Sequence, residues 1–175
     1  MLKLKNISST ISQIYNESDY YVTIRILFEK IDLSDGVCYW NAYGKESSLL
    51  QIGLLNPTGA IYKLVSFLHP SIKHQITLDS EIIHTNIPEK IGLPLFETYV
   101  EKYQEGYYHI DEKIDFKVYL SEKNTTIMLS PNTVVLHVIN DPVIFGFDKD
   151  NNLCYIHIKN MALNDEGFLE QVIMH

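Results

Sequence analysis

Apolar and polar side chains alternate along several stretches of this chain with the period of two that is typical of β-strands. The clearest early example is YYVTIRILFEKI, residues 20–31, in which Val22, Ile24, Ile26 and Phe28 fall on one face. After residue 112 shorter stretches follow, separated by Pro, Asn and Asp, and they predict five further strands: KIDFKVYLS, TTIMLS, TVVLHVIN, VIFGFD and LCYIHIKNM. The pattern therefore predicts a chain built largely of β-strands.

Residues 49–68, LLQIGLLNPTGAIYKLVSFL, contain two apolar segments joined by Asn56, Pro57, Thr58 and Gly59. Asn at the first, Pro at the second and Gly at the fourth position favour a type I turn that ends with a left-handed Gly. Turns of this kind commonly connect antiparallel strands, so we predict a β-hairpin.

A second segment is similar to this hairpin. QIGL around Gly53 is followed by a turn and by IYKL, and IFGF around Gly146 is followed by DKDNN and by LCYI. The two units predict similar hairpins within one sheet, although the general similarity of all β-hairpins explains the pattern equally well.

Two other segments have the apolar spacing of a helix. In GLPLFETYVEKYQEG, residues 92–106, Pro94 fits the first helical position and Gly106 the position after the last turn. Apolar residues recur there at helical spacing: Leu95, Phe96, Tyr99, Val100 and Tyr103. The segment NDEGFLEQVIM begins with the capping residue Asn164 and carries acids in its first turn. We predict a central helix at about residues 94–105 and a C-terminal helix at about residues 164–174.

The predicted elements indicate an α+β fold with a mostly antiparallel sheet of hairpins, a central helix and a C-terminal helix. The chain has 175 residues, the usual size of one domain, and we see no long linker or low-complexity stretch. We therefore expect residues 1–175 to form a single domain.

The composition is that of a folded, acidic protein. The formal net charge is −8, which argues against a nucleic-acid-binding protein, because such a protein normally presents a basic surface. Residues 89–175 carry 7 basic and 14 acidic side chains, whereas residues 1–88 carry 7 and 8. We therefore expect a basic partner to bind the C-terminal half.

Acids of this half gather around the predicted central helix. Glu97, Glu101 and Glu105 are spaced by four residues and form an acidic stripe opposite the apolar one. With the acids and tyrosines that follow, they make up our candidate partner-binding site: Glu97, Glu101, Glu105, Tyr107, Tyr108, Asp111, Glu112 and Asp115. Acids beside tyrosines suit an interface that attracts a basic partner, but a solvated helix face would show the same pattern.

No motif in the sequence identifies a catalytic or cofactor site. DKDNN begins at Asp148 like a calcium loop, but Leu153 and Lys159 stand where such a loop needs Gly and Glu. The 7 histidines lack the spacing of a metal clamp, and the two cysteines, Cys38 and Cys154, form neither a disulfide framework nor a zinc site. We therefore expect no catalysis, cofactor or bound metal, although an enzyme site assembled from distant residues stays open.

The segment MLKLKNISSTISQIYN has no apolar core followed by a small-residue cleavage site, so it does not read as a secretion signal. No apolar run approaches the roughly 18 residues that a membrane-spanning helix requires. A cytoplasmic location without membrane contact is therefore our expectation.

The stretches LLQIGLLNPTGAIYKLVSFL, YHIDEKIDFKVYLSEKNTTIML and VIFGFDKDNNLCYIHIKNM resemble bacterial immunity proteins, which are encoded beside polymorphic or contact-dependent growth inhibition toxins. The resemblance lies in the style of the hairpins, so it assigns no site residue. It implies a non-catalytic protein that binds and blocks a cognate toxin domain. A nuclease is the toxin that an acidic surface suits best, because a nuclease needs basic residues to hold phosphate.

Two other functions remain open from the sequence. One is a small-molecule-binding domain, or an enzyme whose site forms only in the fold. The other is a subunit of a larger assembly that pairs with another chain through an exposed sheet edge. The sequence does not indicate the oligomeric state.

Overall fold

The computed structural model describes residues 1–9, 11–16, 24–28, 36–45, 48–67, 86–98, 107–120 and 124–160. These residues form β-strands joined by turns and short irregular segments, and no α-helix occurs among them. The described strands in chain order are β1 (Leu4–Ser8), β2 (Tyr15–Asn16), β3 (Ile24–Leu27), β4 (Val37–Tyr43), β5 (Leu49–Leu55), β6 (Ile61–Phe67), β7 (Glu89–Ile91), β8 (Leu93–Phe96), β9 (Tyr107–Lys113), β10 (Lys117–Leu120), β11 (Thr125–Met128), β12 (Val134–Asn140), β13 (Val143–Asp148) and β14 (Leu153–Ile158).

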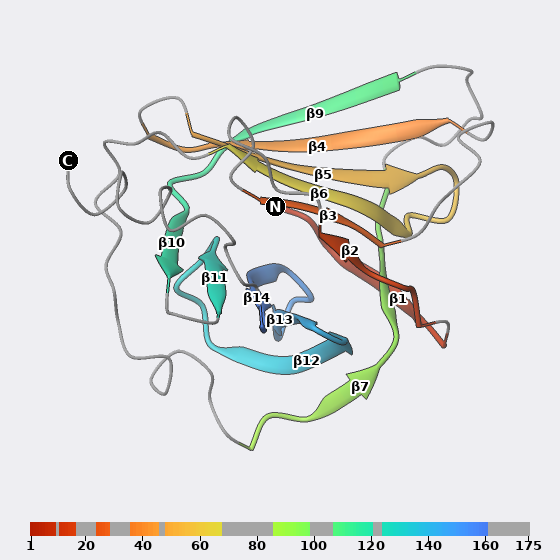
Figure 1. Cartoon of the computed structure of the whole chain (residues 1–175), viewed down its shortest axis with the longest axis vertical. Coiled ribbons are helices and arrows are strands. Elements are labelled where there is room, and N and C mark those ends of the chain that lie inside the picture. Colours follow the sequence, from red (N-terminus) through yellow and green to blue (C-terminus); the bar gives the residue numbers. More distant parts are fainter. Residues whose placement is uncertain are drawn as a thin grey trace.

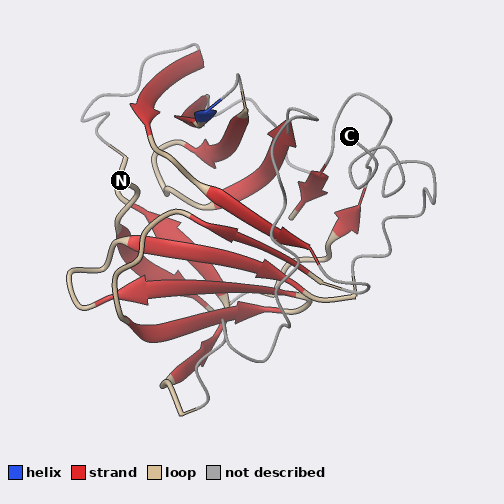
Figure 2. Ribbon diagram, turned by 90° about the vertical axis from the view of Figure 1, so that its left-hand side faces the viewer, coloured by secondary structure: helices blue, strands red, loops and turns tan. Residues whose placement is uncertain are grey.

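Most strands belong to two sheets that face each other (Figure 1, Figure 2). The N-terminal sheet has the strand order β2-β3-β6-β5-β4-β9, and the C-terminal sheet has the order β10-β11-β14-β13-β12-β7. Strands β1 and β8 form a separate two-stranded ribbon. In Figure 1 the N-terminal sheet lies at the top and the C-terminal sheet curves beneath it. The architecture is that of a β-sandwich.

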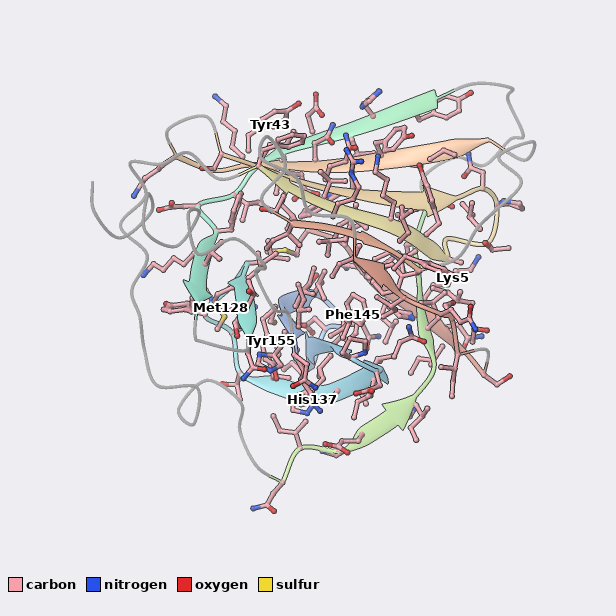
Figure 3. The ribbon with its side chains drawn as sticks, viewed as in Figure 1. Lys5, Tyr43, Met128, His137, Phe145 and Tyr155 are labelled. Carbon is pink, nitrogen blue, oxygen red and sulfur yellow. The ribbon has the colours of Figure 1, made fainter. Side chains whose placement is uncertain are left out.

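The facing sides of the two sheets share one apolar core. Trp40 and Ile52 of the N-terminal sheet and Phe145 and Ile156 of the C-terminal sheet are fully buried within it. The rings of Phe28 and Phe145 meet between the sheets with their centroids 5.9 Å apart. Figure 3 shows Phe145 in the interior of the molecule. Burial of these side chains is the main force that holds the sheets together.

The predicted α+β class is wrong for the described part of the chain, which is nearly all β. Where we predicted the start of the central helix, Leu93–Phe96 form strand β8 and pair antiparallel with β1. Because β1 supplies backbone hydrogen bonds and both Leu93 and Phe96 are buried, tertiary pairing overrides the helical spacing of the sequence. The rest of that helix beyond residue 98, and the C-terminal helix at about residues 164–174, lie outside the described residues.

Most of the predicted strands are confirmed. The alternation in residues 20–31 corresponds to β3, and Ile24, Ile26 and Phe28 are buried, whereas Val22 lies outside the described residues. The stretches after residue 112 correspond to β10, β11, β12, β13 and β14. Every residue of β13 and of β14 is buried, which agrees with their nearly continuous apolar sequences.

Strands β5 and β6 form the hairpin that the sequence predicts. The N–H of Leu55 donates to the carbonyl of Ala60 at 2.9 Å, and the N–H of Gly59 donates to the carbonyl of Leu55 at 2.8 Å. Gly59 has a φ of 75°, the left-handed conformation predicted for this position. The Asn56–Pro57 peptide bond is cis.

The similar hairpin around Gly146 is formed by β13 and β14, but it lies in the other sheet, so the prediction of one shared sheet is wrong. Strands β3, β4, β5 and β6 have the same relative order as β11, β12, β13 and β14. Each hairpin shifts its register directly after its glycine, which is Gly53 in one sheet and Gly146 in the other. The sequence similarity therefore reflects a repeated arrangement of strands.

A tyrosine packs on the glycine of each hairpin. A Cβ atom on Gly53 would lie 2.4 Å from the ring of Tyr62, and a Cβ atom on Gly146 would lie 2.6 Å from the ring of Tyr155. Both tyrosines come from the strand that follows the glycine, β6 or β14. The glycines are therefore required for close approach of an aromatic ring to the backbone.

Each sheet also receives an edge strand that pairs in parallel. Strand β9 lies beside β4 in the N-terminal sheet, and β7 lies beside β12 in the C-terminal sheet. In the chain, β7 of the C-terminal sheet is the next described strand after the β5–β6 hairpin of the N-terminal sheet, and β9 of the N-terminal sheet directly precedes β10 of the C-terminal sheet. The two sheets are therefore interlocked by exchange of their edge strands.

Candidate functional site: the outer face of the N-terminal sheet

The outward sides of the two sheets differ in exposure. In the C-terminal sheet the outward residues Thr126, Ile144 and His157 are buried. In the N-terminal sheet the outward residues Tyr43 and Phe67 are 44% and 37% exposed. We call the outward side of strands β3, β6, β5, β4 and β9 the exposed face. At its centre Asn41, Tyr62 and Val65 are buried, so its accessible parts are the strand ends at Tyr43 and Phe67 and the strand β9.

Tyr43, Leu49 and Phe67 form an apolar row across the exposed face, which we call the aromatic row. Tyr43 of β4 lies opposite Leu49 of β5, and Leu49 lies opposite Phe67 of β6. Figure 3 shows Tyr43 on the side of its sheet that is turned away from the C-terminal sheet. Large apolar side chains that remain accessible on neighbouring strands are typical of a contact surface for another molecule.

A row of hydrogen-bonded polar side chains runs beside the aromatic row. The Gln51 amide donates to Asn41 Oδ1 at 3.0 Å, and the Asn41 amide donates to Asp111 Oδ1 at 2.8 Å. The same Asn41 nitrogen lies 3.3 Å from His109 Nδ1. Asn41 is buried, so these contacts fix the orientation of the Asp111 carboxylate on the exposed face.

Two tyrosines and a histidine surround Gly53 on the exposed face. The Tyr62 hydroxyl donates to the Tyr39 hydroxyl at 2.9 Å, and the Tyr39 ring stacks on His109 with centroids 5.3 Å apart. Since Tyr62 also packs directly on Gly53, the three rings are held in fixed positions. Of the three rings, His109 is exposed and Tyr39 is partly exposed, whereas Tyr62 is buried.

The equivalent place in the C-terminal sheet is closed to solvent. There the Tyr155 hydroxyl shares a hydrogen bond with His137 Nε2, and both residues are buried (Figure 3). Burial raises the pKa of Tyr155 to about 12, and the nearby Cys154 contributes in the same direction. The hydroxyl therefore stays protonated at neutral pH, and the pair contributes to the structure of the sheet.

Some residues of the predicted partner-binding site make contacts within the protein instead of lying free at its surface. The Glu112 carboxylate accepts a hydrogen bond from Trp40 Nε1 at 2.9 Å and pairs with the amino group of Met1. Tyr108 is half-buried and packs against the core. The structure therefore places these two candidates in contacts within the protein.

Other candidates lie at the surface without forming one cluster. Asp111 lies on the exposed face, whereas Asp115 follows β9 and pairs with Lys45 at 2.8 Å. Glu97 is exposed after β8, and Tyr107 lies opposite Val37 in the β4–β9 pair. The Tyr107 side chain and all of Glu101 and Glu105 lie outside the described residues. Of the predicted site residues whose side chains are described, Asp111 is the one at an outward strand position of the exposed face.

Asp148 accepts several hydrogen bonds within the turn between β13 and β14. Its carboxylate accepts hydrogen bonds from the side chains of Asn132 and Asn152 and from the backbone N–H groups of Asp150 and Asn152. Burial alone would raise the pKa of the Asp148 carboxyl, but these hydrogen bonds together hold that pKa below its usual value. The oxygens are therefore already satisfied by protein donors.

We expect Asp148→Ala to lower the free energy of unfolding by about 2–3 kcal/mol, because several part-buried hydrogen bonds lose their charged acceptor. A carboxyl with a depressed pKa stabilises the fold above its unfolded pKa, near 3.9, and this contribution is lost as the pH falls through the folded pKa. Urea unfolding near pH 7 and near pH 2 should therefore show a smaller difference for the variant than for the parent protein. Asp150→Ala, which replaces an exposed side chain of the same turn, is the control. Equal pH dependence in parent and Asp148→Ala would contradict this role.

The two thiols are buried. Burial raises the pKa of Cys38, and burial together with the charge of Asp148 raises the pKa of Cys154 to about 11. Both thiols are therefore protonated at neutral pH and are poor nucleophiles.

The described residues contain no group of three or more His, Cys, Asp or Glu side chains that could hold a metal ion. In this part of the chain, no helix is long and apolar enough to cross a membrane.

Residues 37–43, VCYWNAY, are a sequence signal for the exposed face, because they alternate between the buried core residues Cys38, Trp40 and Ala42 and the outward residues Tyr39 and Tyr43. This is the period of a strand with one side against a core. The alternation could have predicted β4, but not which of its polar and aromatic residues would meet side chains of β5 and β9.

Comparison with known proteins adds no relative: no protein family matches this chain, and no curated protein matches it.

Proposed function

We propose that this protein is a non-catalytic immunity protein, which binds a cognate bacterial toxin domain in the cytoplasm and blocks it. The observation that carries a binding role is the aromatic row on the exposed face, where Tyr43 and Phe67 remain accessible beside Leu49. The narrower proposal of a toxin as partner rests on the resemblance of the hairpins to immunity proteins.

The chemistry of the exposed face suits a protein partner. Interfaces concentrate their binding energy in a few aromatic anchors that are surrounded by polar groups. Tyr43 and Phe67 supply such anchors, and Asn41, Gln51 and Asp111 supply hydrogen-bonding groups whose orientation is already fixed. A face that is ordered before binding loses little conformational entropy when the partner docks.

The charge of the protein favours a basic partner. The net charge of −8 attracts a basic protein at long range, and exposed acids such as Glu97 and Asp115 lie at the surface. On the exposed face itself, Asp111 provides a carboxylate on the β9 edge beside Lys113. Arg25 and Lys63 lie on the same face, towards the opposite edge of the sheet. A nuclease toxin, which needs basic residues to hold phosphate, is the partner class that this charge suits.

Replacement of an aromatic anchor tests the proposal. We expect Tyr43→Ala and Phe67→Ala each to weaken binding to the toxin domain encoded beside this gene by about tenfold or more, which corresponds to about 1.4 kcal/mol. Isothermal titration calorimetry with the purified toxin domain measures the loss, and survival of toxin-expressing cells measures protection.

Ile91→Ala is the matched control, because Ile91 is 70% exposed on β7 at the edge of the other sheet. We expect it to bind the toxin domain like the parent protein. Unchanged affinity in Tyr43→Ala and Phe67→Ala would exclude the exposed face as the interface. Absence of any binding by the parent protein would exclude the toxin as partner.

A further inference from the structure

Two positively charged residues lie side by side on the exposed face, at the end opposite to Asp111. Arg25 of β3 lies opposite Val65 of β6, and Lys63 of β6 lies opposite Leu27 of β3. Arg25 and Lys63 therefore point to the same side of adjacent strands in diagonal positions, close enough for long side chains to meet. Both side chains are half-buried, so they are partly shielded from water, but a ligand in solution can still reach them.

No acid in the described part of the chain neutralises this pair. Asp111 is the one acid at an outward position of the described strands in this sheet, and it accepts its hydrogen bond from Asn41. Four strand spacings separate β3 from β9, which is about 19 Å and too far for an ion pair. In addition, Arg25 Nε is buried and has no hydrogen-bond partner within the described ranges.

The environment of Lys63 disfavours its charged form. Burial lowers the pKa of Lys63 below its usual value, and the positive charge of Arg25 lowers it further. The two like charges have no counter-ion in the described part of the chain, and like charges held together in this way destabilise a fold. Positions where a protein retains such a conflict are often functional. A bound anion would remove the repulsion and satisfy Arg25 Nε.

We propose that Arg25 and Lys63 form an anion site that binds an Asp or Glu carboxylate of the partner protein. Guanidinium groups bind carboxylates through two parallel hydrogen bonds, and the ammonium group of Lys63 adds a third donor. The apolar neighbours Val65 and Leu27 strengthen these contacts by excluding water. That the carboxylate belongs to the partner protein rests on the proposed function, whereas the anion site itself does not.

The site can be tested without a toxin. Sodium acetate is added to the full-length protein at constant ionic strength, with sodium chloride as reference, and the Nε–H signal of Arg25 is followed by NMR. We expect a saturable shift with acetate that is at least about fivefold smaller in Lys63→Gln, because the site then loses one of its two charges. Lys117→Gln, which replaces an exposed lysine on β10, should shift like the parent protein.

The outcomes of this titration separate the possible ligands. A saturable shift with sodium phosphate but none with acetate would overturn the carboxylate proposal in favour of a phosphate group. A shift that never saturates, or one that is equal in Lys63→Gln and the parent protein, would overturn the site. A further variant, Arg25→Lys, keeps the positive charge but removes the guanidinium group. Unfolding measurements on Arg25→Lys and on Lys63→Gln show whether each variant is folded.

A second arm asks whether the partner uses the site. We expect Lys63→Gln to weaken binding of the toxin domain by about tenfold, the loss typical of one charged hydrogen-bonding partner. Unchanged toxin affinity together with a confirmed acetate site would overturn the partner carboxylate as ligand. Failure of the parent protein to bind the toxin domain would overturn the proposed function, while the acetate result would still decide the anion site.

Discussion

Replacement of Gly59 by Ala is expected to lower the free energy of unfolding by about 3–5 kcal/mol. A Cβ atom on Gly59 would lie 1.9 Å from the backbone oxygen of Phe96, and the φ of Gly59 is 75°. The Phe96 N–H donates to the Gly59 carbonyl at 2.8 Å, so the turn and β8 are held at this distance. Because the overlap involves backbone, no side-chain rotation relieves it. Urea unfolding followed by circular dichroism measures the loss.

Two further variants separate the overlap from the backbone conformation. Asn adopts a left-handed conformation more readily than Ala, but it carries the same Cβ atom, so Gly59→Asn should be nearly as destabilising. Asn151 occupies the equivalent turn of the other hairpin with a φ of 63°, and its carbonyl accepts the N–H of Leu4 at 2.9 Å. We expect Asn151→Gly to change stability by less than about 0.5 kcal/mol. Full stability of Gly59→Asn would contradict the overlap.

The second large effect concerns the contact between the sheets. We expect Phe145→Ala to lower the free energy of unfolding by about 3–5 kcal/mol. Phe145 is fully buried in β13, an inner strand of the C-terminal sheet, and its ring packs against Phe28 next to β3 of the other sheet. The substitution removes buried apolar surface and the aromatic pair, and it leaves a cavity that the surrounding strands cannot fill. Thermal unfolding followed by near-ultraviolet circular dichroism measures the change.

Val135→Ala provides the matched control, since Val135 is 43% exposed on the neighbouring strand β12. We expect it to cost less than about 0.5 kcal/mol, and Phe145→Leu to cost less than Phe145→Ala because it keeps part of the buried volume. Similar losses in Val135→Ala and Phe145→Ala would mean that the two sheets do not pack over Phe145.

The strands and the hairpin of this fold could be predicted from local sequence, because alternation and turn residues act over a few positions. The helix predicted at about residues 94–105 shows where local reasoning fails. Pro94 and the apolar pair Leu95 and Phe96 suit the first turn of a helix as well as a strand. The choice depends on Leu4–Ser8, which supply the pairing strand from a distant part of the chain.

The residues of the candidate site could be predicted even less from local sequence, because strand pairing between distant segments brings them together. The alternation in residues 20–31 already placed Arg25 opposite the core, but nothing near it in sequence indicated Lys63 as its neighbour. The two residues meet because β3 pairs with β6. In the same way, the acids near residue 111 suggested one acidic surface, whereas the strand register directs Asp111 outward and Glu112 inward to Trp40. Composition identified the charges, and only the pairing of strands assigned their roles.

The exchange of edge strands between the sheets has a consequence for synthesis of the chain. A ribosome releases β4 well before β9, and β5, β6, β7 and β8 all emerge between these two partners. Until β9 is synthesised, one edge of β4 has no strand to pair with. In the same way, β7 has no pairing strand until β12 is synthesised. Unpaired edges can pair with other chains, and contacts between distant residues slow folding. Neither half of the nascent protein can complete its own sheet, so the finished sandwich forms only after both halves have left the ribosome.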